Sequence, residues 1–162
     1  MLLSRDLLRV AKARLDDNSC RNEAGLRRAT SDLYYACFHS ICEALVEPIG
    51  VIPDSIEFRK LYTKIYRQLD HGYAERRCNT VSKESLFDPS VSAFAKQFIT
   101  MKTKREDADY DPLMKFSIKE VENHYTLTSA RIERFWNCDS KIRSTFALYV
   151  GLRTTGGKEV TK

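Results

Sequence analysis

Three short groups of polar and titratable side chains have the residue types and the spacing that chemistry requires. They are Arg28, Asp32, Tyr35 and His39; Arg67, Asp70 and His71; and Arg105, Asp109 and Tyr110. Clusters of titratable groups are where proteins shift pKa values for acid–base work. Each group also has a purely structural explanation. The first could be a solvated helix face, the second could hold a histidine stabilised by the dipole at a helix C-terminus, and the third could be an ion pair. Residue chemistry alone favours these structural explanations.

No motif for a metal or a cofactor accompanies the three groups. The sequence contains no Gly-rich phosphate loop, no G-x-S-x-G, no H-E-x-x-H and no Cys/His cluster. Its three histidines are scattered, and its five cysteines are odd in number and form no C-x-x-C pair. We therefore predict no metal, no cofactor and no disulfide framework, with the cysteines reduced.

The composition indicates one soluble helical domain. Of the 162 residues, 43% are hydrophobic and 30% are charged, with only six Gly and four Pro. Alternating β-branched residues are scarce, which favours an all-α fold. The net charge of +5 permits nucleic-acid binding without requiring it. The N-terminus does not resemble a signal peptide, and no apolar run reaches the ~18 residues of a membrane span, so we predict a cytoplasmic protein with no membrane association.

The chain is organised around a helix expected over residues 22–45. Small and apolar side chains recur there at spacings of three and four and cover most of its circumference: Leu26, Ala29, Leu33, Ala36, Ser40 and Ala44. The narrow remaining face carries Arg28, Asp32, Tyr35 and His39. A largely buried helix with one polar seam is therefore expected at the centre of the fold.

The segments on either side of this helix give weaker signals. A first helix is expected over residues 3–16. Asp54 and Glu57 are spaced as a helix N-cap and its third residue, and Gly72 is a natural helix stop after His71. Arg67 and His71 would then lie one turn apart on this helix. Residues 73–87 are polar and unpatterned, which predicts a loop.

The helix that begins at Asp88 and Pro89 matters most for function. Its buried stripe comprises Val91, Phe94, Phe98 and Met101. The same spacing continues to Arg105, so we expect Arg105 to project inward. A buried charge must be paired, and the nearest acidic residues are Asp107, Asp109 and Asp111.

Two further helices complete the predicted fold. Ser117 and Glu120 form a capping box that begins one of them, and the last starts at Asp139 or Ser140. We predict a bundle of five to six helices that forms a single domain over residues 1–152, followed by a disordered tail over residues 153–162.

Three blocks of the sequence resemble the HEPN-domain family (higher eukaryotes and prokaryotes nucleotide-binding). Arg28-Ala-Thr-Ser-Asp-Leu-Tyr-Tyr-Ala-Cys-Phe-His39 resembles that family's R-A-x-S-x-x-Y-Y-A-x-F-H helix. Leu69-Asp-His71-Gly72 is similar to its His-Gly, and Arg105-Glu-Asp-Ala-Asp-Tyr110 is similar to its R-x-x-A-D-Y. The resemblance covers residues 5–136, and many members of the family are small prokaryotic toxins or defence proteins.

The resemblance implies an up-and-down helical bundle that forms a homodimer. In active members it implies a metal-independent ribonuclease with a composite site at the dimer interface. Those members carry Arg, four to six further residues, and then His. The Arg stabilises the phosphate, and the His takes the proton of the ribose 2′-hydroxyl to leave a cyclic phosphate. In this sequence Tyr110, Asp111 and Pro112 occupy the positions for that His, and Arg67 and His71 are one residue too close.

Two functional hypotheses follow, with a plain structural protein as the third. In the first, the chain is an RNA-cleaving protein of a toxin–antitoxin or defence system, and His71 or His39 replaces the missing base. In the second, a non-catalytic dimer binds RNA, a nucleotide, or a partner such as an antitoxin or a nucleotidyltransferase that modifies Tyr110. The candidate catalytic residues are Arg105, His71, Asp109 and Tyr110; the candidate binding residues are Arg28, Asp32, Tyr35, His39 and Asp70.

Overall fold

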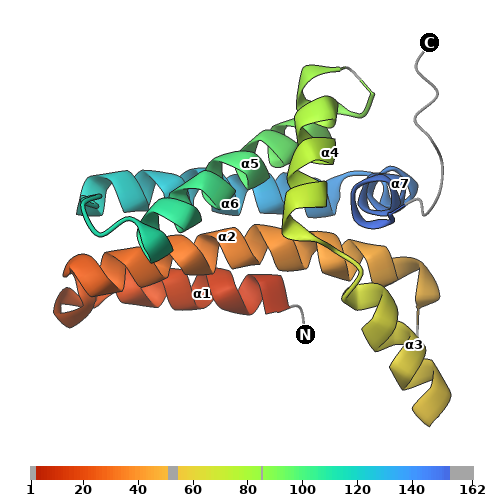
Figure 1. The fold of residues 1–162 in the computed structure, drawn as a ribbon, viewed down its shortest axis with the longest axis horizontal. Helices are drawn as coiled ribbons and strands as arrows, with labels where there is room; N and C mark the ends of the chain where they lie inside the picture. The colour runs from red at the N-terminus through yellow and green to blue at the C-terminus, as the bar shows by residue number, and fades with distance from the viewer. Residues whose placement is uncertain (1–2, 51–54, 85, 154–162) are drawn as a thin grey trace.

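The computed structural model describes residues 3–50, 55–84 and 86–153, and these form an all-α helical bundle (Figure 1). The α-helices in these ranges are α1 (Leu3–Asp16), α2 (Glu23–Val46), α3 (Ile56–Tyr66), α4 (His71–Lys83), α5 (Pro89–Tyr110), α6 (Ile118–Asn137) and α7 (Ser140–Gly151). The predicted all-α class is confirmed. The prediction of five to six helices is wrong, because the described ranges hold seven.

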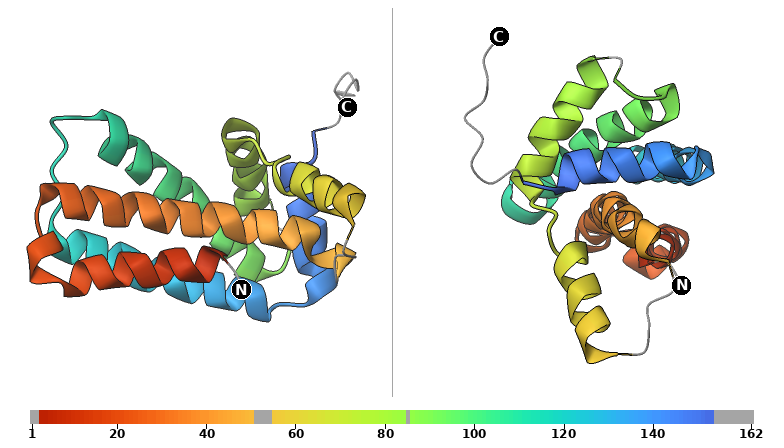
Figure 2. Two further views of the ribbon diagram at one scale, coloured as in Figure 1. Left: turned by 90° about the horizontal axis from the view of Figure 1, so that it is seen from below. Right: turned by 90° about the vertical axis from the view of Figure 1, so that its right-hand side faces the viewer.

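The central helix α2 organises the other elements. α1 runs alongside α2, while α5 and α6 cover its opposite side (Figure 1). α7 packs across the C-terminal half of α2, and α4 stands upright against α5 and α7 (Figure 2). α3 contacts α2 and then projects away from the bundle, and we call it the arm.

The centrality of α2 follows from its nearly continuous apolar surface. Its six predicted core positions, from Leu26 to Ala44, are all at most 4% exposed. Asn22 caps the helix by accepting a hydrogen bond of 3.0 Å from the backbone N–H of Gly25. A Cβ at Gly25 would overlap the carbonyl oxygen of Cys20 and lie 2.8 Å from its carbonyl carbon. The turn that joins α1 to α2 therefore depends on a glycine at this position.

The core beside α2 is aromatic. The Phe94 and Phe135 rings stack with 4.2 Å between their centroids, and Phe146 meets both of them edge-on. The predicted buried stripe of α5 is confirmed, because its four members are all 0% exposed. Asp88 caps α5 by accepting a hydrogen bond from Ser90 N, with Pro89 in the first turn as expected. This packing fixes the direction in which the last turns of α5 point.

A buried arginine holds α7 against the end of α2. Arg143 is 5% exposed and pairs through Nε with Oε2 of Glu47 at 2.8 Å. Its Nη1 donates to the backbone carbonyls of Trp136 and Cys138, each at 2.9 Å. The charge is thus compensated and hydrogen-bonded, as burial requires.

The loop predicted over residues 73–87 is wrong, because α4 occupies most of it. Asp70 caps α4 by accepting a hydrogen bond of 2.8 Å from Tyr73 N, so Gly72 lies inside the helix instead of ending the previous one. The buried side of α4 consists of Ala74, Cys78 and Val81. They are spaced three and four residues apart, as on one face of a helix. Because they are few and small, and their neighbours are polar, the sequence pattern did not indicate a helix.

The arm is shorter than predicted and buries none of its residues fully. It begins after Ser55, whose side chain accepts a hydrogen bond from Phe58 N, and it ends at Tyr66. Asp54, the predicted cap, lies outside the described residues, as does all of the predicted tail except Arg153. None of the described helices has the length and hydropathy needed to cross a membrane.

Candidate functional site

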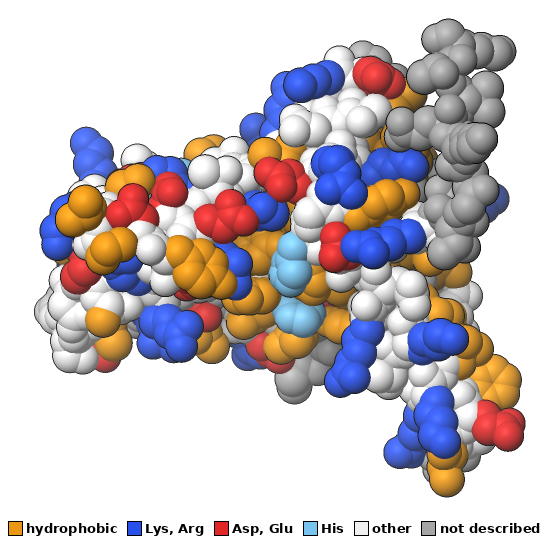
Figure 3. Space-filling view, in the orientation of Figure 1, with side chains coloured by type: hydrophobic (Ala, Val, Ile, Leu, Met, Phe, Trp, Pro, Cys, Tyr) orange, Lys and Arg blue, Asp and Glu red, His pale blue; other side chains and the backbone are white. Residues whose placement is uncertain are grey.

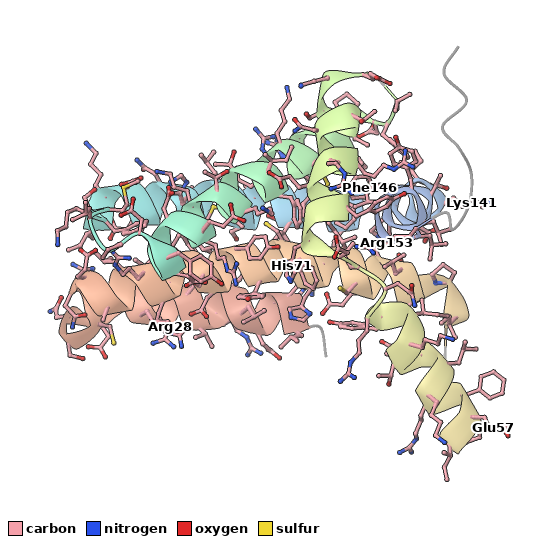
Figure 4. The ribbon with its side chains drawn as sticks, in the orientation of Figure 1. Arg28, Glu57, His71, Lys141, Phe146 and Arg153 are labelled. Atoms are coloured by element: carbon pink, nitrogen blue, oxygen red, sulfur yellow. The ribbon has the colours of Figure 1, made fainter. Side chains whose placement is uncertain are left out.

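The candidate site lies where α2, α4 and α5 meet the arm. α2 supplies Tyr35 and His39, α5 supplies Arg105, and α4 supplies His71 from its first turn. Figure 4 shows His71 at the foot of α4, directly over α2. In the space-filling view, histidine side chains lie at the centre of this face, at the junction of the bundle and the arm (Figure 3). The structure therefore gathers residues from all three of the polar groups in the sequence.

Arg105 projects inward and is paired, as predicted from the helical spacing. Its Nη2 donates a hydrogen bond of 3.0 Å to Tyr35 Oη. Its Nε lies 2.7 Å from Oδ2 of Asp109, although this close ion pair lacks the angle of a hydrogen bond. The other carboxylate oxygen of Asp109 accepts a hydrogen bond of 2.8 Å from Ser31 Oγ. Asp109 is the partner among the three acidic candidates.

The guanidinium of Arg105 is surrounded by aromatic rings. Its Cζ lies 5.8 Å from the Tyr34 ring centroid, 5.6 Å from that of Tyr35 and 5.4 Å from that of Tyr110. Such cation–π contacts hold an arginine in place while leaving some of its N–H donors free. Burial lowers the pKa of Arg105, but Tyr35 and Asp109 raise it by more, so the group stays charged.

His71 is held against α2 by a stack and a hydrogen bond. Its ring stacks on Phe38 with 4.3 Å between centroids, and its Nδ1 is hydrogen-bonded to Tyr34 Oη. The residue keeps an exposed surface, yet partial burial against α2 lowers the pKa of His71, with the positive charge of Arg105 as the next cause. His71 is also the first residue of α4, where the helix dipole disfavours a cation. His71 is therefore neutral near pH 7.

His39 is the second histidine at the site and is bound to the arm. Its Nδ1 lies 2.7 Å from Tyr66 Oη, and the two rings stack with centroids 5.8 Å apart. Burial lowers the pKa of His39, and the charge on His71 lowers it further when that residue is protonated. The charges of these residues are therefore coupled: Arg105 lowers the pKa of His71, and protonated His71 lowers the pKa of His39.

Several predicted site residues have other partners. Asp32 pairs with Arg14 Nε at 2.9 Å, and burial raises its pKa in spite of that arginine. Arg28 is exposed on α2 (Figure 4). Asp70 caps α4 and pairs with Arg153 Nη2 at 2.8 Å. Asp32 and Asp70 position helices, and none of these three residues contacts Arg105 through a described hydrogen bond or ion pair.

Two sequence-based expectations about the second polar group are wrong. Arg67 and His71 do not share one helix, because the arm ends at Tyr66 and α4 begins at His71. His71 is consequently at a helix N-terminus, so the helix dipole opposes its protonation instead of stabilising it. The structural explanation offered for this histidine does not hold.

Four residues of the site were missed: Ser31, Tyr34, Phe38 and Tyr66. Tyr34 and Phe38 lie on the apolar flank of α2, where the spacing indicates core packing and gives no sign of a partner. Ser31 and Tyr66 contact residues 78 and 27 positions away along the chain. No local sequence signal could have identified these partners, because each contact depends on how the helices pack.

The fold and the site define an all-α bundle with a cationic, aromatic and histidine-bearing surface. Comparison of the chain with protein-family models, curated proteins and solved structures finds no match. Within the described residues, no group of three or more His, Cys, Asp and Glu side chains is arranged to hold a metal ion.

Proposed function

We propose that the chain is a HEPN-type protein of a toxin–antitoxin or defence system that cleaves RNA without a metal. The observation that carries the proposal is that His71 and Arg105 share a neighbour. Both contact the same tyrosine, because Tyr34 Oη binds His71 Nδ1 and the Arg105 guanidinium faces the Tyr34 ring. A neutral histidine next to a fixed cation is the pair that transesterification at phosphorus needs.

His71 would act as the general base in place of the histidine that is absent after Arg105. In the tautomer that donates Nδ1–H to Tyr34, the lone pair of Nε2 is free to accept a proton. Nε2 takes the proton of the ribose 2′-hydroxyl, and the 2′-oxygen attacks the adjacent phosphorus. The bond from phosphorus to the 5′-oxygen breaks, and this oxygen takes a proton from water; the hydroxide that remains takes back the proton from Nε2, which restores neutral His71. The products are a 2′,3′-cyclic phosphate and a 5′-hydroxyl.

Arg105 would stabilise the charge that develops on the phosphate. Tyr35 takes one N–H of Nη2 and Asp109 pairs with Nε, so both donors of Nη1 and the second donor of Nη2 remain to contact a phosphate oxygen. The fixed position of the side chain means that little conformational entropy is lost when the phosphate binds.

A homodimer is part of this proposal. Tyr110, the last residue of α5, is 72% exposed and its ring faces Arg105, and Leu113 in the segment after α5 is 86% exposed. Exposed apolar groups beside a candidate site suit a surface that a second copy covers. Light scattering that gives the mass of two chains would support it, and a monomer at assay concentration would contradict it.

The second candidate function is binding of RNA, a nucleotide or a protein partner without cleavage. The observation in its favour is that Arg105 is already engaged by Asp109 and Tyr35, as a structural arginine would be. A binding protein would show RNA affinity that weakens steeply with salt and would release no product.

The test is RNA cleavage in EDTA by the wild-type protein and three variants. Arg105→Ala and His71→Gln are each expected to lower the rate by about 100-fold or more, through loss of phosphate stabilisation and of the base. Arg134→Ala removes an exposed arginine of α6 and serves as the matched control. Circular dichroism checks that the variants fold.

The outcomes separate the two candidate functions. Cleavage in EDTA that leaves a cyclic phosphate and is lost in Arg105→Ala, but not in Arg134→Ala, supports the nuclease. RNA binding by the wild-type protein without any product refutes cleavage and leaves the binding function. A nuclease activity that is equal in all four proteins is a contaminant and refutes the roles given to Arg105 and His71.

A further inference from the structure

Five ring side chains form a continuous strip from the arm to the candidate site, and we call them the aromatic strip: Tyr62, Tyr66, His39, Phe38 and His71. Tyr62 stacks on Tyr66 with centroids 6.2 Å apart, and Tyr66 stacks on His39 at 5.8 Å. His39 meets Phe38 edge-on at 5.6 Å, and Phe38 stacks on His71 at 4.3 Å. Three helices, α3, α2 and α4, contribute to the strip.

The aromatic strip lies at the surface and not in the core. Tyr62, Tyr66, Phe38 and His39 are each partly exposed, and His71 is exposed. The pale-blue histidine side chains at the centre of Figure 3 mark its inner end, and the arm carries its outer end. A core cluster of this size would be buried on all sides, so the strip has rings available for a ligand.

The helix that carries the tyrosines of the strip is also rich in positive charge. Residues 55–67 contain Arg59, Lys60, Lys64 and Arg67 but a single acidic residue, Glu57. Arg59 precedes Tyr62 by three residues and Tyr66 by seven, so helical spacing places it beside both rings. An open groove along the same helix is lined by Ile56, Arg59, Lys60, Thr63, Lys64 and Arg67.

Three of the four basic residues of the arm, Lys60, Lys64 and Arg67, form no ion pair with any residue that the structure describes. The arm also buries no residue fully, and only Ile65 and Tyr66 at its inner end pack against the core, so most of its surface is open to a ligand. A polyanion fits such a surface by charge complementarity.

We propose that the aromatic strip and the basic side of the arm bind a single-stranded segment of RNA and lead it to Arg105 and His71. The bases stack on the rings of the strip, and Lys and Arg side chains of the arm contact the phosphates. Bases inside a duplex stack on one another and present no free face, so the strip selects unpaired RNA. This inference rests on the proposed RNA function and names the conformation of the substrate.

The test measures binding to a probe that cannot be cleaved. A fluorescent single-stranded 2′-deoxy oligouridine of about ten nucleotides lacks the attacking hydroxyl, and a duplex of equal length is its comparison. Fluorescence anisotropy with the full chain should show tighter binding of the single strand. Tyr62→Ala should weaken that binding about fivefold or more, since one stacked base contributes about 1–3 kcal/mol.

Two further variants make the test specific. Tyr62→Phe keeps the ring and should bind as the wild type does. Leu61→Ala removes an apolar side chain that is 48% exposed on the same helix but lies about 100° around the helix from Tyr62, and it should leave binding unchanged. The proposal is overturned by unchanged binding in Tyr62→Ala, by an equal loss in Leu61→Ala, or by equal affinity for the duplex.

Failure of this proposal can be told apart from failure of the nuclease. If Tyr62→Ala weakens binding of the deoxy strand but the wild-type protein cleaves no RNA, the binding role of the aromatic strip is supported and the nuclease activity is refuted. If RNA cleavage is lost in Arg105→Ala but Tyr62→Ala binds as the wild type does, the nuclease activity is supported and the binding role of the strip is refuted.

Discussion

Replacing Gly25 with alanine should destabilise the protein, although Gly→Ala inside a helix is normally favourable by about 0.5–1 kcal/mol. The new Cβ would overlap the carbonyl oxygen of Cys20 and lie 2.8 Å from its carbon and 3.1 Å from its Cα. These are backbone atoms, so they cannot rotate away as a side chain could. The turn before α2 must shift instead, and with it the cap that Asn22 forms on Gly25.

The size of the effect follows from what that shift disrupts. Overpacking typically costs about 1–3 kcal/mol, and loss of an Asn cap costs about 1 kcal/mol. Because both costs fall on one turn and are only partly additive, we expect a net loss of about 2–3 kcal/mol in the free energy of unfolding. For a chain of this size that is a fall in Tm of about 4–12 °C.

The matched control is Gly72→Ala in α4. A Cβ there would lie 3.7 Å from Asp70 Oδ1 and 3.8 Å from Arg76 Nη1, which are ordinary contacts. This substitution should leave the protein as stable or raise the free energy of unfolding by about 0.4–1 kcal/mol. Urea unfolding followed by circular dichroism compares the two variants. Equal stability of Gly25→Ala and the wild type would refute the close packing of α2 on the preceding turn.

Three further predictions concern buried or partly buried titratable groups. Because burial lowers the pKa of His71, the unfolded chain binds a proton more readily, so the free energy of unfolding should fall as the pH drops below 6.5; urea titrations should show a smaller fall in His71→Gln. Any cleavage rate should rise with pH over the same range and level off before neutrality, because the base must be unprotonated. Arg143→Met should cost about 2 kcal/mol or more in urea unfolding, since Glu47 and two backbone carbonyls lose their partner; a cost below that of an ordinary surface substitution would contradict the burial of this pair.

The helix starts that were predicted correctly are those fixed by local chemistry. Asn22, Asp88 and Ser117 each accept a hydrogen bond from the backbone of the helix that follows, and such caps are visible in the sequence. The inward direction of Arg105 was also predictable, because it continues the spacing of a strongly apolar stripe. These features depend on a few neighbouring residues and not on the rest of the fold.

The features that escaped prediction depend on packing between helices. α4 has only a weak stripe of its own, and its burial is decided by α5 and α7, against which it packs. The contacts of His71 with Tyr34 and of His39 with Tyr66 join helices whose relative position no local pattern specifies. The sequence therefore indicated which residues could do chemistry, but not which of them meet.

The short break between the arm and α4 accounts for most of the candidate site. A single helix through residues 56–83 would carry His71 away from α2 along a straight axis. Because the chain turns at residues 67–70, Asp70 can cap α4 and His71 enters its first turn over Tyr34 and Phe38. The same turn directs the arm outward, so its basic side stays exposed and Tyr66 reaches His39. One change of chain direction thus places His71 on the tyrosine that Arg105 also contacts, and it leaves the basic residues of the arm exposed.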